Sequence, residues 1–465
     1  MLFCVLGLWK SDLLKKVCYY IAALLTATQL VALVYLLIPA VTNGEFSVER
    51  RSFASSDYLW EIGDQENLVI LVLDSFDQNY LTKLIEEDNE ELYKLDGFRY
   101  FSNYSGLFRS TTYGITPLLT GDTFINQEGW EEYLETNGTY YDDLISQGYD
   151  IDVYSGEWKH VPGYVRDKVR NIIDAKITMK GVRLKAAELL YRLAWSKYLP
   201  DYVKCYVWLY GPELEGFERY DSDSVPFDWY NSTFRDGLKQ NGVSVSSGKQ
   251  FKFIHLYGAH EPYFTGKDLE DVDENWDVDS IPQGAIKLAT IYIEELKKVG
   301  VYDDSTIIIT SDHGSTHVPG ILSNPILLIK EKGSHGALIE SKAPVSEADF
   351  GATVVDLLNG DAEYKNEESA LTIKEDAVRE RKYYGYLFTD DDTIAMDENQ
   401  YILVEYDVDN GNASTPYFSL TGAGYLSNGK KYDHRDYCKT CAEGLQPEIE
   451  NNWMYWEHIK AGNPH

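Results

Sequence analysis

The chain has 465 residues, of which 44% are hydrophobic and 25% are charged, so it is long enough for one large globular domain with a smaller addition. Its formal net charge is −33 at pH 7, from 75 acidic and 42 basic residues. Binding to nucleic acid requires a basic surface, so this charge balance excludes nucleic acid as a partner. Such acidity mainly favours solubility.

The first predicted element is an apolar helix near the amino terminus. Residues 17–41 contain no charged side chain. At about 1.5 Å per residue, such a helix is long enough to cross a hydrocarbon core of about 30 Å. Lys10, Lys15 and Lys16 precede it, so the positive-inside rule places the residues after it outside the cell. We therefore expect a membrane anchor with at least one pass over residues 1–45, with a cleavable signal peptide as the alternative.

Two runs farther along the chain combine a strand with acidic residues at its end. Residues 67–73 are apolar after Asn and lead into Asp74, and residues 305–311 lead into Asp312 and His313. A strand that is apolar on both faces is typical of a parallel sheet covered by helices on both sides. Ligands of such sheets bind beyond the carboxyl ends of the strands. Asp74 alone could equally cap the next helix, but two carboxylates and an imidazole suit a divalent cation.

Two polar segments lie between these strands. Residues 109–121 read Arg-Ser-Thr-Thr-Tyr-Gly-Ile-Thr-Pro-Leu-Leu-Thr-Gly, and residues 255–263 read His-Leu-Tyr-Gly-Ala-His-Glu-Pro-Tyr. A threonine hydroxyl can complete the ligand set of a metal. The first segment can also be an ordinary helix start capped by Ser110 or Thr111, which would direct backbone N–H groups at an anion. We interpret His255 as structural, because it lies inside an apolar strand.

In these four runs the sequence resembles the alkaline-phosphatase-like superfamily, which includes sulfatases, lipoteichoic acid synthases and phosphoethanolamine transferases. The resemblance covers roughly residues 65–360, and residues 296–314 and 343–358 are its most specific pieces. It is closest to the lipoteichoic acid synthase and phosphoethanolamine transferase branch, because the formylglycine motif of sulfatases does not occur in the chain. It implies an α/β fold with a mostly parallel central sheet and helices on both faces.

The resemblance implies one metal ion and a threonine nucleophile. Asp74, Thr111, Asp312 and His313 would hold the divalent ion, with manganese or zinc ahead of magnesium or calcium. Thr111 is the expected nucleophile when the segment is aligned on its Leu-Thr-Gly end. An alignment on the proline instead favours Thr112, which is kept as the alternative.

The resemblance also implies residues that contact the substrate. His260 would protonate the leaving oxygen or hold a phosphate oxygen. Arg109 and Thr112 are further candidates for substrate binding. Many relatives place another histidine after the second metal segment. This chain offers His317 or His335 at that point, and the sequence does not decide between them.

The function implied is that of a membrane-anchored, metal-dependent transferase with its catalytic domain outside the cell. It would move phosphoglycerol or phosphoethanolamine from a membrane phospholipid onto an envelope glycan or polymer, through a covalent phospho-threonine. Two alternatives stay open. One is a sulfatase-like hydrolase of sulfuric esters or phosphodiesters, in which water replaces the acceptor. The other is a catalytically silent relative that senses lipids.

The rest of the chain predicts a small β-rich appendage. From about residue 376 the sequence has short apolar alternation typical of strands and hairpins. Near the end, Cys438 and Cys441 predict a local disulfide in an oxidising exterior, with a thioredoxin-like redox pair as the alternative. The predicted domains are a membrane anchor over 1–45, a linker over 46–64, a catalytic domain over 65–375 and the appendage over 376–465.

Overall fold

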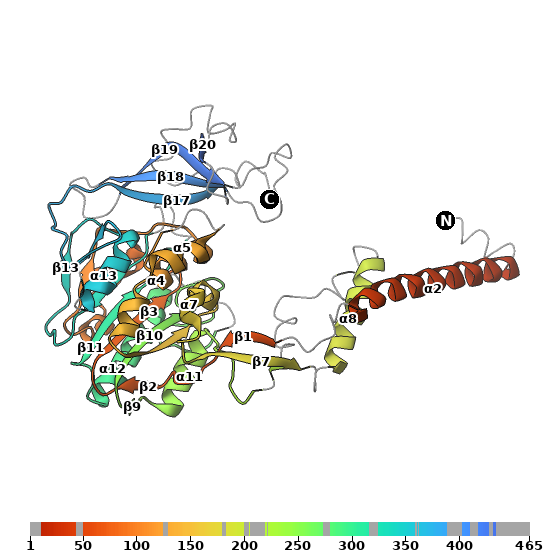
Figure 1. The fold of residues 1–465 in the computed structure, drawn as a ribbon, viewed down its shortest axis with the longest axis horizontal. Helices are drawn as coiled ribbons and strands as arrows, with labels where there is room; N and C mark the ends of the chain where they lie inside the picture. Colours follow the sequence, from red (N-terminus) through yellow and green to blue (C-terminus); the bar gives the residue numbers. More distant parts are fainter. Residues whose placement is uncertain are drawn as a thin grey trace. The chain divides into compact units, whose positions relative to one another are not determined.

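Figure 1 shows the fold of the chain as a computed structural model. The structure describes residues 11–42, 50–123, 129–178, 183–199, 204, 219–220, 222–272, 280–315, 324–358, 360, 362–387, 402–409, 417–426 and 431–433. The chain divides into two compact units. The first comprises Met1–Ser52 and Asp174–Asp223, and the second comprises Phe53–Ile173 and Ser224–His465. The central sheet lies in the second unit.

The first unit contains a long helix near the amino terminus. Helix α2 spans Ser11–Thr42, so the helix expected over residues 17–41 is present. Within the described ranges, no helix combines the length and the hydropathy that crossing a membrane requires. The prediction of a transmembrane span over 17–41 is therefore not supported by the structure. The same unit contains α8 over Arg183–Tyr198.

Seven strands form the central sheet of the second unit, in the order β13-β4-β12-β11-β3-β10-β6 (Figure 1). In chain order they are β3 (Asn67–Leu73), β4 (Arg99–Phe101), β6 (Tyr149–Tyr154), β10 (Lys249–Leu256), β11 (Ser305–Thr310), β12 (Leu327–Lys330) and β13 (Ile339–Ser341). Strands β11, β3, β10 and β6 pair in parallel. Only β12 runs antiparallel to its neighbours in this sheet. The expectation of a mostly parallel central sheet is confirmed.

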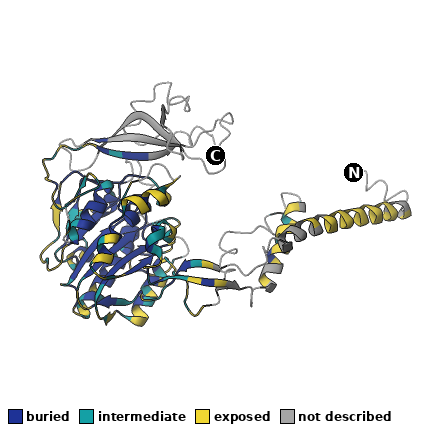
Figure 2. Ribbon diagram, in the orientation of Figure 1, coloured by how far each residue is buried: buried dark blue, intermediate teal, exposed yellow. Residues whose placement is uncertain are grey.

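Strand β3 explains why this sheet is covered on both faces. All its residues are buried, and successive side chains point to opposite faces. The odd-numbered side chains from Val69 to Leu73 pack in one hydrophobic core, and the even-numbered ones from Leu68 to Val72 pack in another. Figure 2 shows the buried strands between layers of helices. The first core is closed by α3 (Gln78–Glu86), α11 (Asn231–Asn241) and α12 (Ser280–Lys298), and the second by α4 (Thr111–Thr120), α6 (Tyr141–Ser146) and α13 (Phe350–Leu357).

Shorter elements complete the second unit. They include β2 (Glu61–Gly63) paired with β9 (Ser244–Ser246), β5 (Tyr104–Ser105) paired with β14 (Val345–Ser346), β15 (Glu363–Tyr364) paired with β16 (Glu367–Glu368), the helices α5 (Trp130–Asn137) and α7 (Gly163–Arg166), and the 3-10 helices Glu90–Lys94, Trp158–His160 and Glu347–Asp349.

Within the predicted linker over 46–64, Leu59 and Ile62 pack in the first core. The folded part of the chain therefore includes these residues.

The carboxyl-terminal part contains a four-stranded antiparallel sheet. Its strands are β17 (Arg381–Leu387), β18 (Ile402–Asp409), β19 (Tyr417–Leu426) and β20 (Lys431–Asp433). The strands expected from about residue 376 are therefore present. Cys438 and Cys441 lie outside the described residues, so their disulfide stays a prediction.

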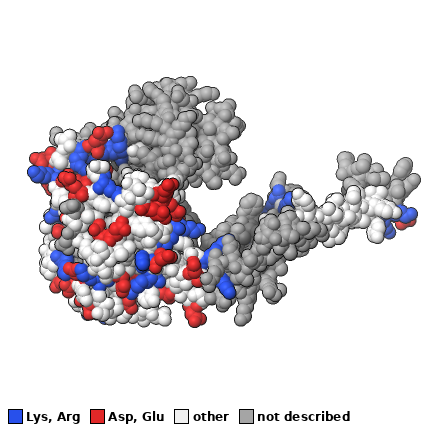
Figure 3. All heavy atoms as spheres, viewed as in Figure 1, with Lys and Arg blue, Asp and Glu red and all other residues white. Residues whose placement is uncertain are grey.

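The acidic surplus of the chain is distributed over its surface. On the face of the second unit seen in Figure 3, acidic and basic side chains are interspersed. Several pair with each other, including Arg170 with Asp150 and Lys332 with Glu66. Surface charge of this kind contributes to solubility more than to the fold.

Helix α4 approaches the end of β11 closely because of one glycine. A Cβ atom built on Gly114 would lie 2.1 Å from the carbonyl oxygen of Asp312. Only glycine therefore lets the first turns of α4 pack directly on the backbone that follows β11. Helix α4 then ends at Gly121, whose φ of 69° suits glycine at a helix end. This contact brings the start of α4 to the carboxyl edge of the sheet.

We predict that Gly114→Ala destabilises the protein by about 1–3 kcal/mol, because the added methyl group collides with backbone that cannot rotate away. Gly156→Ala is the matched control, since a Cβ atom at Gly156 meets no atom within 4 Å. Its effect should stay within about 0.5 kcal/mol. Urea denaturation of the three proteins measures both effects. Equal denaturation midpoints for Gly114→Ala and the unmodified chain would show that the helix can move away from Asp312 at no cost.

Candidate metal centre

Strand pairing brings the polar side chains of three strands to one edge of the sheet. In the parallel register, Val72 of β3 lies opposite His255 of β10 and opposite Thr310 of β11. Asp74 follows Val72 by two residues, and Asp312 follows Thr310 by two residues. The two carboxylates are therefore at the same level along neighbouring strands, just beyond the point where the ladder ends.

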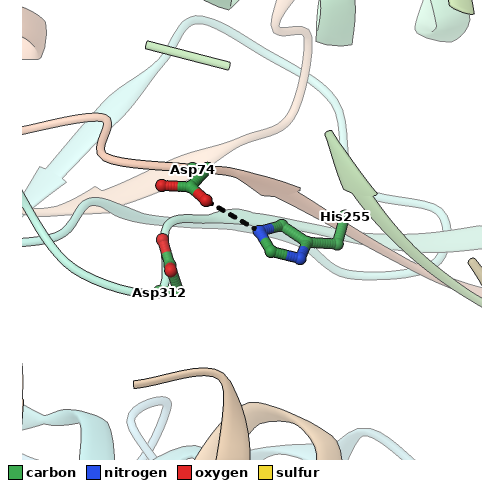
Figure 4. A group of neighbouring side chains, drawn as sticks. All are labelled: Asp74, His255 and Asp312. Carbon is green, nitrogen blue, oxygen red and sulfur yellow. Dashed lines mark ion pairs between the residues drawn. The ribbon is translucent and has the colours of Figure 1, made fainter. Parts of the chain in front are cut away.

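The resulting group of side chains is compact and buried. Asp74, His255 and Asp312 each offer a ligand atom, and these atoms all lie within 4.8 Å of one another (Figure 4). His255 Nε2 is 3.3 Å from Asp74 Oδ2, which is the ion pair drawn in Figure 4. Neither carboxylate is exposed, and His255 is 1% exposed. The three residues could therefore hold a metal ion out of contact with bulk water.

Two atoms of this group have unused hydrogen-bonding capacity. Asp312 Oδ2 and His255 Nε2 are buried, and neither makes a hydrogen bond of good geometry within the described structure. An unsatisfied buried polar atom costs roughly 1–3 kcal/mol. A divalent cation bound between them would remove this cost for both atoms. The residues present therefore fit a divalent ion, and a donor set of carboxylate oxygens with imidazole nitrogen suits zinc or manganese.

The start of α4 adds a hydroxyl to this group. Thr111 Oγ1 is 3.4 Å from Asp74 Oδ2 and 3.3 Å from His313 Nε2. His313 Nε2 is in turn 3.5 Å from Asp312 Oδ2 and 3.7 Å from Asp74 Oδ1. The structure therefore brings together all four residues that the resemblance implied as metal ligands. Thr112 is exposed, and it is the hydroxyl of Thr111 that contacts the group.

The protonation of His313 follows from its neighbour. Its Nδ1 lies 2.7 Å from the carbonyl oxygen of Gly314, which can only accept a hydrogen bond. Nδ1 therefore carries the proton. In the neutral ring this leaves a lone pair on Nε2, the atom that faces Thr111, Asp74 and Asp312. That lone pair can bind a metal or accept a proton.

Neighbouring charges offset the effect of burial on the pKa of two members of this group, Asp74 and His255. Burial works to raise the pKa of Asp74, but the neighbouring imidazoles of His255 and His313 lower that pKa overall. Burial likewise works to lower the pKa of His255, but the adjacent Asp74 and the charge of Asp312 raise that pKa overall. Both directions have one cause: buried carboxylates that lie close together require a positive charge beside them.

The sequence-based interpretation of His255 as a structural residue did not include it among the candidate metal ligands, whereas the structure places it in the candidate metal group. Its position within an apolar strand gave no distinguishing signal. What distinguishes His255 is the register between β10 and β3. This register pairs His255 with Val72, close to the end of β3 and so close to Asp74. Ser155 also contacts its ring, with 3.2 Å between Oγ and Nδ1. A histidine close to the carboxyl end of a parallel strand is therefore a candidate ligand for a metal at that edge of the sheet.

His260 lies beside this group and is not one of its three members. Its Nδ1 donates to the carbonyl oxygen of Glu261. Its ring centroid is 5.1 Å from that of Tyr257 and 5.8 Å from that of Trp229, and Trp229 also contacts the ring of His255 at 5.7 Å. One indole thus contacts both histidines. Arg109 is half-buried in the turn before α4.

Of the two candidates for a further ligand, His335 is not part of this group. His335 Nδ1 is 2.9 Å from Asp96 Oδ2, and His335 Nε2 is 3.4 Å from Asp303 Oδ1. Asp303 precedes β11, whereas Asp312 follows it, so His335 lies at the opposite end of that strand. His317 lies outside the described residues.

Comparisons with known proteins give matches in structure only. No protein-family model and no curated protein sequence matches the chain. A Vibrio parahaemolyticus protein in the alkaline phosphatase superfamily matches with a TM-score of 0.43 and 14% identity, covering 89% of this chain and 90% of that chain. The lipoteichoic acid synthase LtaP from Listeria monocytogenes matches with a TM-score of 0.39 and 14% identity, covering 81% of this chain and 88% of that chain.

A third match is the C-terminal periplasmic domain of EcEptC from Escherichia coli, in complex with Zn. Its TM-score is 0.39 and its identity is 13%, covering 69% of this chain and 89% of that chain. At these identities and TM-scores, both the fold and the reaction are argued from the structure of this chain itself. The chain is similar in structure to members of the alkaline phosphatase superfamily.

Proposed function

We propose that this chain is a metal-dependent transferase that forms a covalent phospho-threonine at Thr111. The observation that carries the proposal is the position of the Thr111 hydroxyl, which contacts Asp74 and His313 at the start of α4. The donor would be a membrane phospholipid with a phosphoglycerol or phosphoethanolamine head group. The acceptor would be a hydroxyl of an envelope glycan or polymer, outside the cell.

Asp74, Thr111, Asp312 and His313 would hold one divalent ion, with His255 completing the set through its Nε2 atom. Two imidazole nitrogens among the donors favour zinc or manganese over magnesium or calcium. When bound, such an ion lowers the pKa of a coordinated hydroxyl and neutralises phosphate charge. The buried, unsatisfied atoms of Asp312 and His255 support this assignment.

In the first step, the Thr111 hydroxyl attacks the phosphorus of the lipid head group. Its proton passes to Asp74 Oδ2, to which Thr111 donates at 3.4 Å. The bond from Thr111 Oγ1 to phosphorus forms, and the bond from phosphorus to the diacylglycerol oxygen breaks. The backbone N–H groups of Thr111 and Thr112 open α4 and can bind phosphate oxygens, whereas that of Tyr113 donates to the Ser110 carbonyl at 3.2 Å. His260 then donates a proton to the leaving oxygen.

In the second step, an acceptor hydroxyl attacks the same phosphorus, the bond from phosphorus to Thr111 Oγ1 breaks, and Asp74 Oδ2 returns the proton to Oγ1. The acceptor hydroxyl occupies the place that the leaving diacylglycerol oxygen had in the first step. His260, which donated a proton to that oxygen, therefore now takes the proton of the acceptor hydroxyl. Its Nδ1 is used by the Glu261 carbonyl, so Nε2 is the nitrogen that exchanges protons. The head group is thereby transferred without an overall change in charge on the chain.

We predict that the full-length chain, incubated with phospholipid and zinc or manganese, acquires a phosphoglycerol or phosphoethanolamine adduct on Thr111. Peptide mass spectrometry of residues 109–121 detects the adduct and identifies the head group. Thr111→Ala should abolish the adduct and lower turnover by at least about a thousandfold, since removing a nucleophile leaves only residual catalysis. Thr112→Ala is the matched control and should keep the adduct and most of the turnover.

Two results would contradict this mechanism. An adduct on Thr112 would move the nucleophile by one residue. Hydrolysis of phosphodiesters or sulfuric esters without any adduct, and without transfer to an added glycan, would favour a hydrolase instead. Full activity of Thr111→Ala would exclude a covalent threonine intermediate altogether.

We also predict that metal affinity depends on His255. His255→Gln should weaken binding of zinc or manganese by about 10–100-fold, and Asp312→Asn by more, because a buried carboxylate loses its charge. His335→Gln is the matched control and should bind metal as the unmodified chain does, since His335 pairs with Asp96 and Asp303. Isothermal titration calorimetry of the full chain measures these affinities. Equal weakening by His335→Gln and His255→Gln would contradict the assignment of His255.

A further inference from the structure

The first strand of the carboxyl-terminal sheet contacts the segment that leads to Thr111. Phe108 and Tyr384 form a parallel β-bridge, and the backbone N–H of Tyr384 donates to the carbonyl oxygen of Leu107 at 2.7 Å. Leu107 lies four residues before Thr111. Both partners belong to the second compact unit. The start of the appendage is therefore joined to the backbone that precedes α4.

Arg381 of the same strand fixes this segment farther upstream. It is 3% exposed, and its guanidinium donates to the carbonyl oxygen of Asn103 at 2.7 Å and to that of Val345 at 2.9 Å. It also donates to Asn103 Oδ1 at 3.0 Å. Buried hydrogen bonds from a charged donor contribute more than neutral ones. Arg381 thus holds two chain segments against β17.

A stack of three rings continues from β17 to the first turn of α4. The ring centroids of Tyr384 and Phe108 are 5.5 Å apart at an interplanar angle of 27°. Those of Phe108 and Tyr113 are also 5.5 Å apart, at 32°. These residues form a small hydrophobic cluster with Leu107, separate from the two large cores. Tyr113 follows Thr111 by two residues, so the stack ends at the helical turn that carries the proposed nucleophile.

Glu347 holds the same segment from the other side. Its Oε2 accepts a hydrogen bond from the N–H of Leu107 at 2.7 Å, while its Oε1 is buried and makes no hydrogen bond within the described structure. Burial raises the pKa of Glu347 well above the usual range, and the charge of Asp312 acts in the same direction. Leu107 is therefore held through both of its backbone groups, by Glu347 at the N–H and by Tyr384 at the carbonyl.

We propose that Glu347, Arg381 and Tyr384 are positioning residues that fix the Thr111 hydroxyl against Asp74 and His313. We call these three residues the Leu107 clamp. The inference rests on the proposed function, in that Thr111 is the nucleophile. Nucleophilic attack requires the reacting oxygen to be placed within a fraction of an ångström, and a shift of about 1 Å can cost about a hundredfold in rate. The strands hold Asp74, His255 and Asp312, whereas the clamp holds Thr111.

The proposal predicts a selective loss of turnover when the ring stack is removed. Tyr384→Ala should lower kcat at least about tenfold, while KM and the affinity for zinc or manganese stay within about twofold. Tyr384→Phe keeps the ring and should restore kcat. Hydrogen exchange in the full chain should become faster for the amides of residues 104–113 in Tyr384→Ala, because the segment loses its support.

Tyr292→Ala is the control variant. It should lower the stability of the protein without moving the Thr111 hydroxyl. Tyr292 is fully buried and packs in the first core, which does not contain the Leu107 cluster. This variant should unfold at lower urea concentration but keep the kcat of each folded molecule and the exchange rates of residues 104–113. If Tyr384→Ala and Tyr292→Ala lower kcat equally for each folded molecule, the clamp only adds stability.

Glu347 provides a second, independent comparison. Glu347→Gln keeps an oxygen that accepts from Leu107 and should stay within about threefold of the unmodified kcat. Glu347→Leu removes the acceptor and should behave like Tyr384→Ala. A large loss of metal affinity in Glu347→Gln would instead make Glu347 part of the metal centre and would overturn its assignment to the clamp. If Thr111→Ala stays fully active, the proposed function fails, while the exchange rates still decide whether the clamp exists.

Discussion

The site depends on two carboxylates that are buried side by side. Asp74 and Asp312 are inaccessible to solvent at the ends of neighbouring parallel strands, where the loss of hydration and their mutual repulsion both oppose folding. Positive charge next to them offsets this cost, and His255 supplies part of it in the structure. The backbone after β10 also packs closely against Asp74. Gly258 has a φ of 55°, and a Cβ atom there would lie 2.6 Å from the Asp74 nitrogen, so only glycine permits this approach.

Much of this arrangement can be predicted from the sequence because β3 and β11 are buried on both faces. A strand with that environment must be apolar along its length, so a polar residue directly after it marks the edge where the ladder stops. Asp74, Asp312 and His313 were identified in this way. The strands of the appendage were predicted from alternation. The antiparallel direction of β12 could not be predicted, because three apolar residues and a lysine carry no information on strand direction.

The rest of the site requires three-dimensional information. His255 has the same sequence context as a structural histidine, and only the register between β10 and β3 places it near Asp74. The choice between Thr111 and Thr112 also stayed open in the sequence. Successive residues on a helix differ by about 100° in direction, so once α4 begins at Thr111 only one of the two hydroxyls can face Asp74. The phase of a helix depends on how it packs, here through Gly114 on Asp312.

The strand residues of the metal group and Thr111 are therefore supported by different parts of the fold. Asp74, His255 and Asp312 lie in or directly after paired strands, so any movement of one relative to another breaks ladder hydrogen bonds. Thr111 has no such support, since it begins a helix after an irregular segment. A cation can balance the charges of this site, but it exerts no control over the backbone that leads into α4. Contacts to Leu107 from Glu347 and Tyr384 supply that control, because they use the two backbone groups that an irregular segment would otherwise leave to solvent.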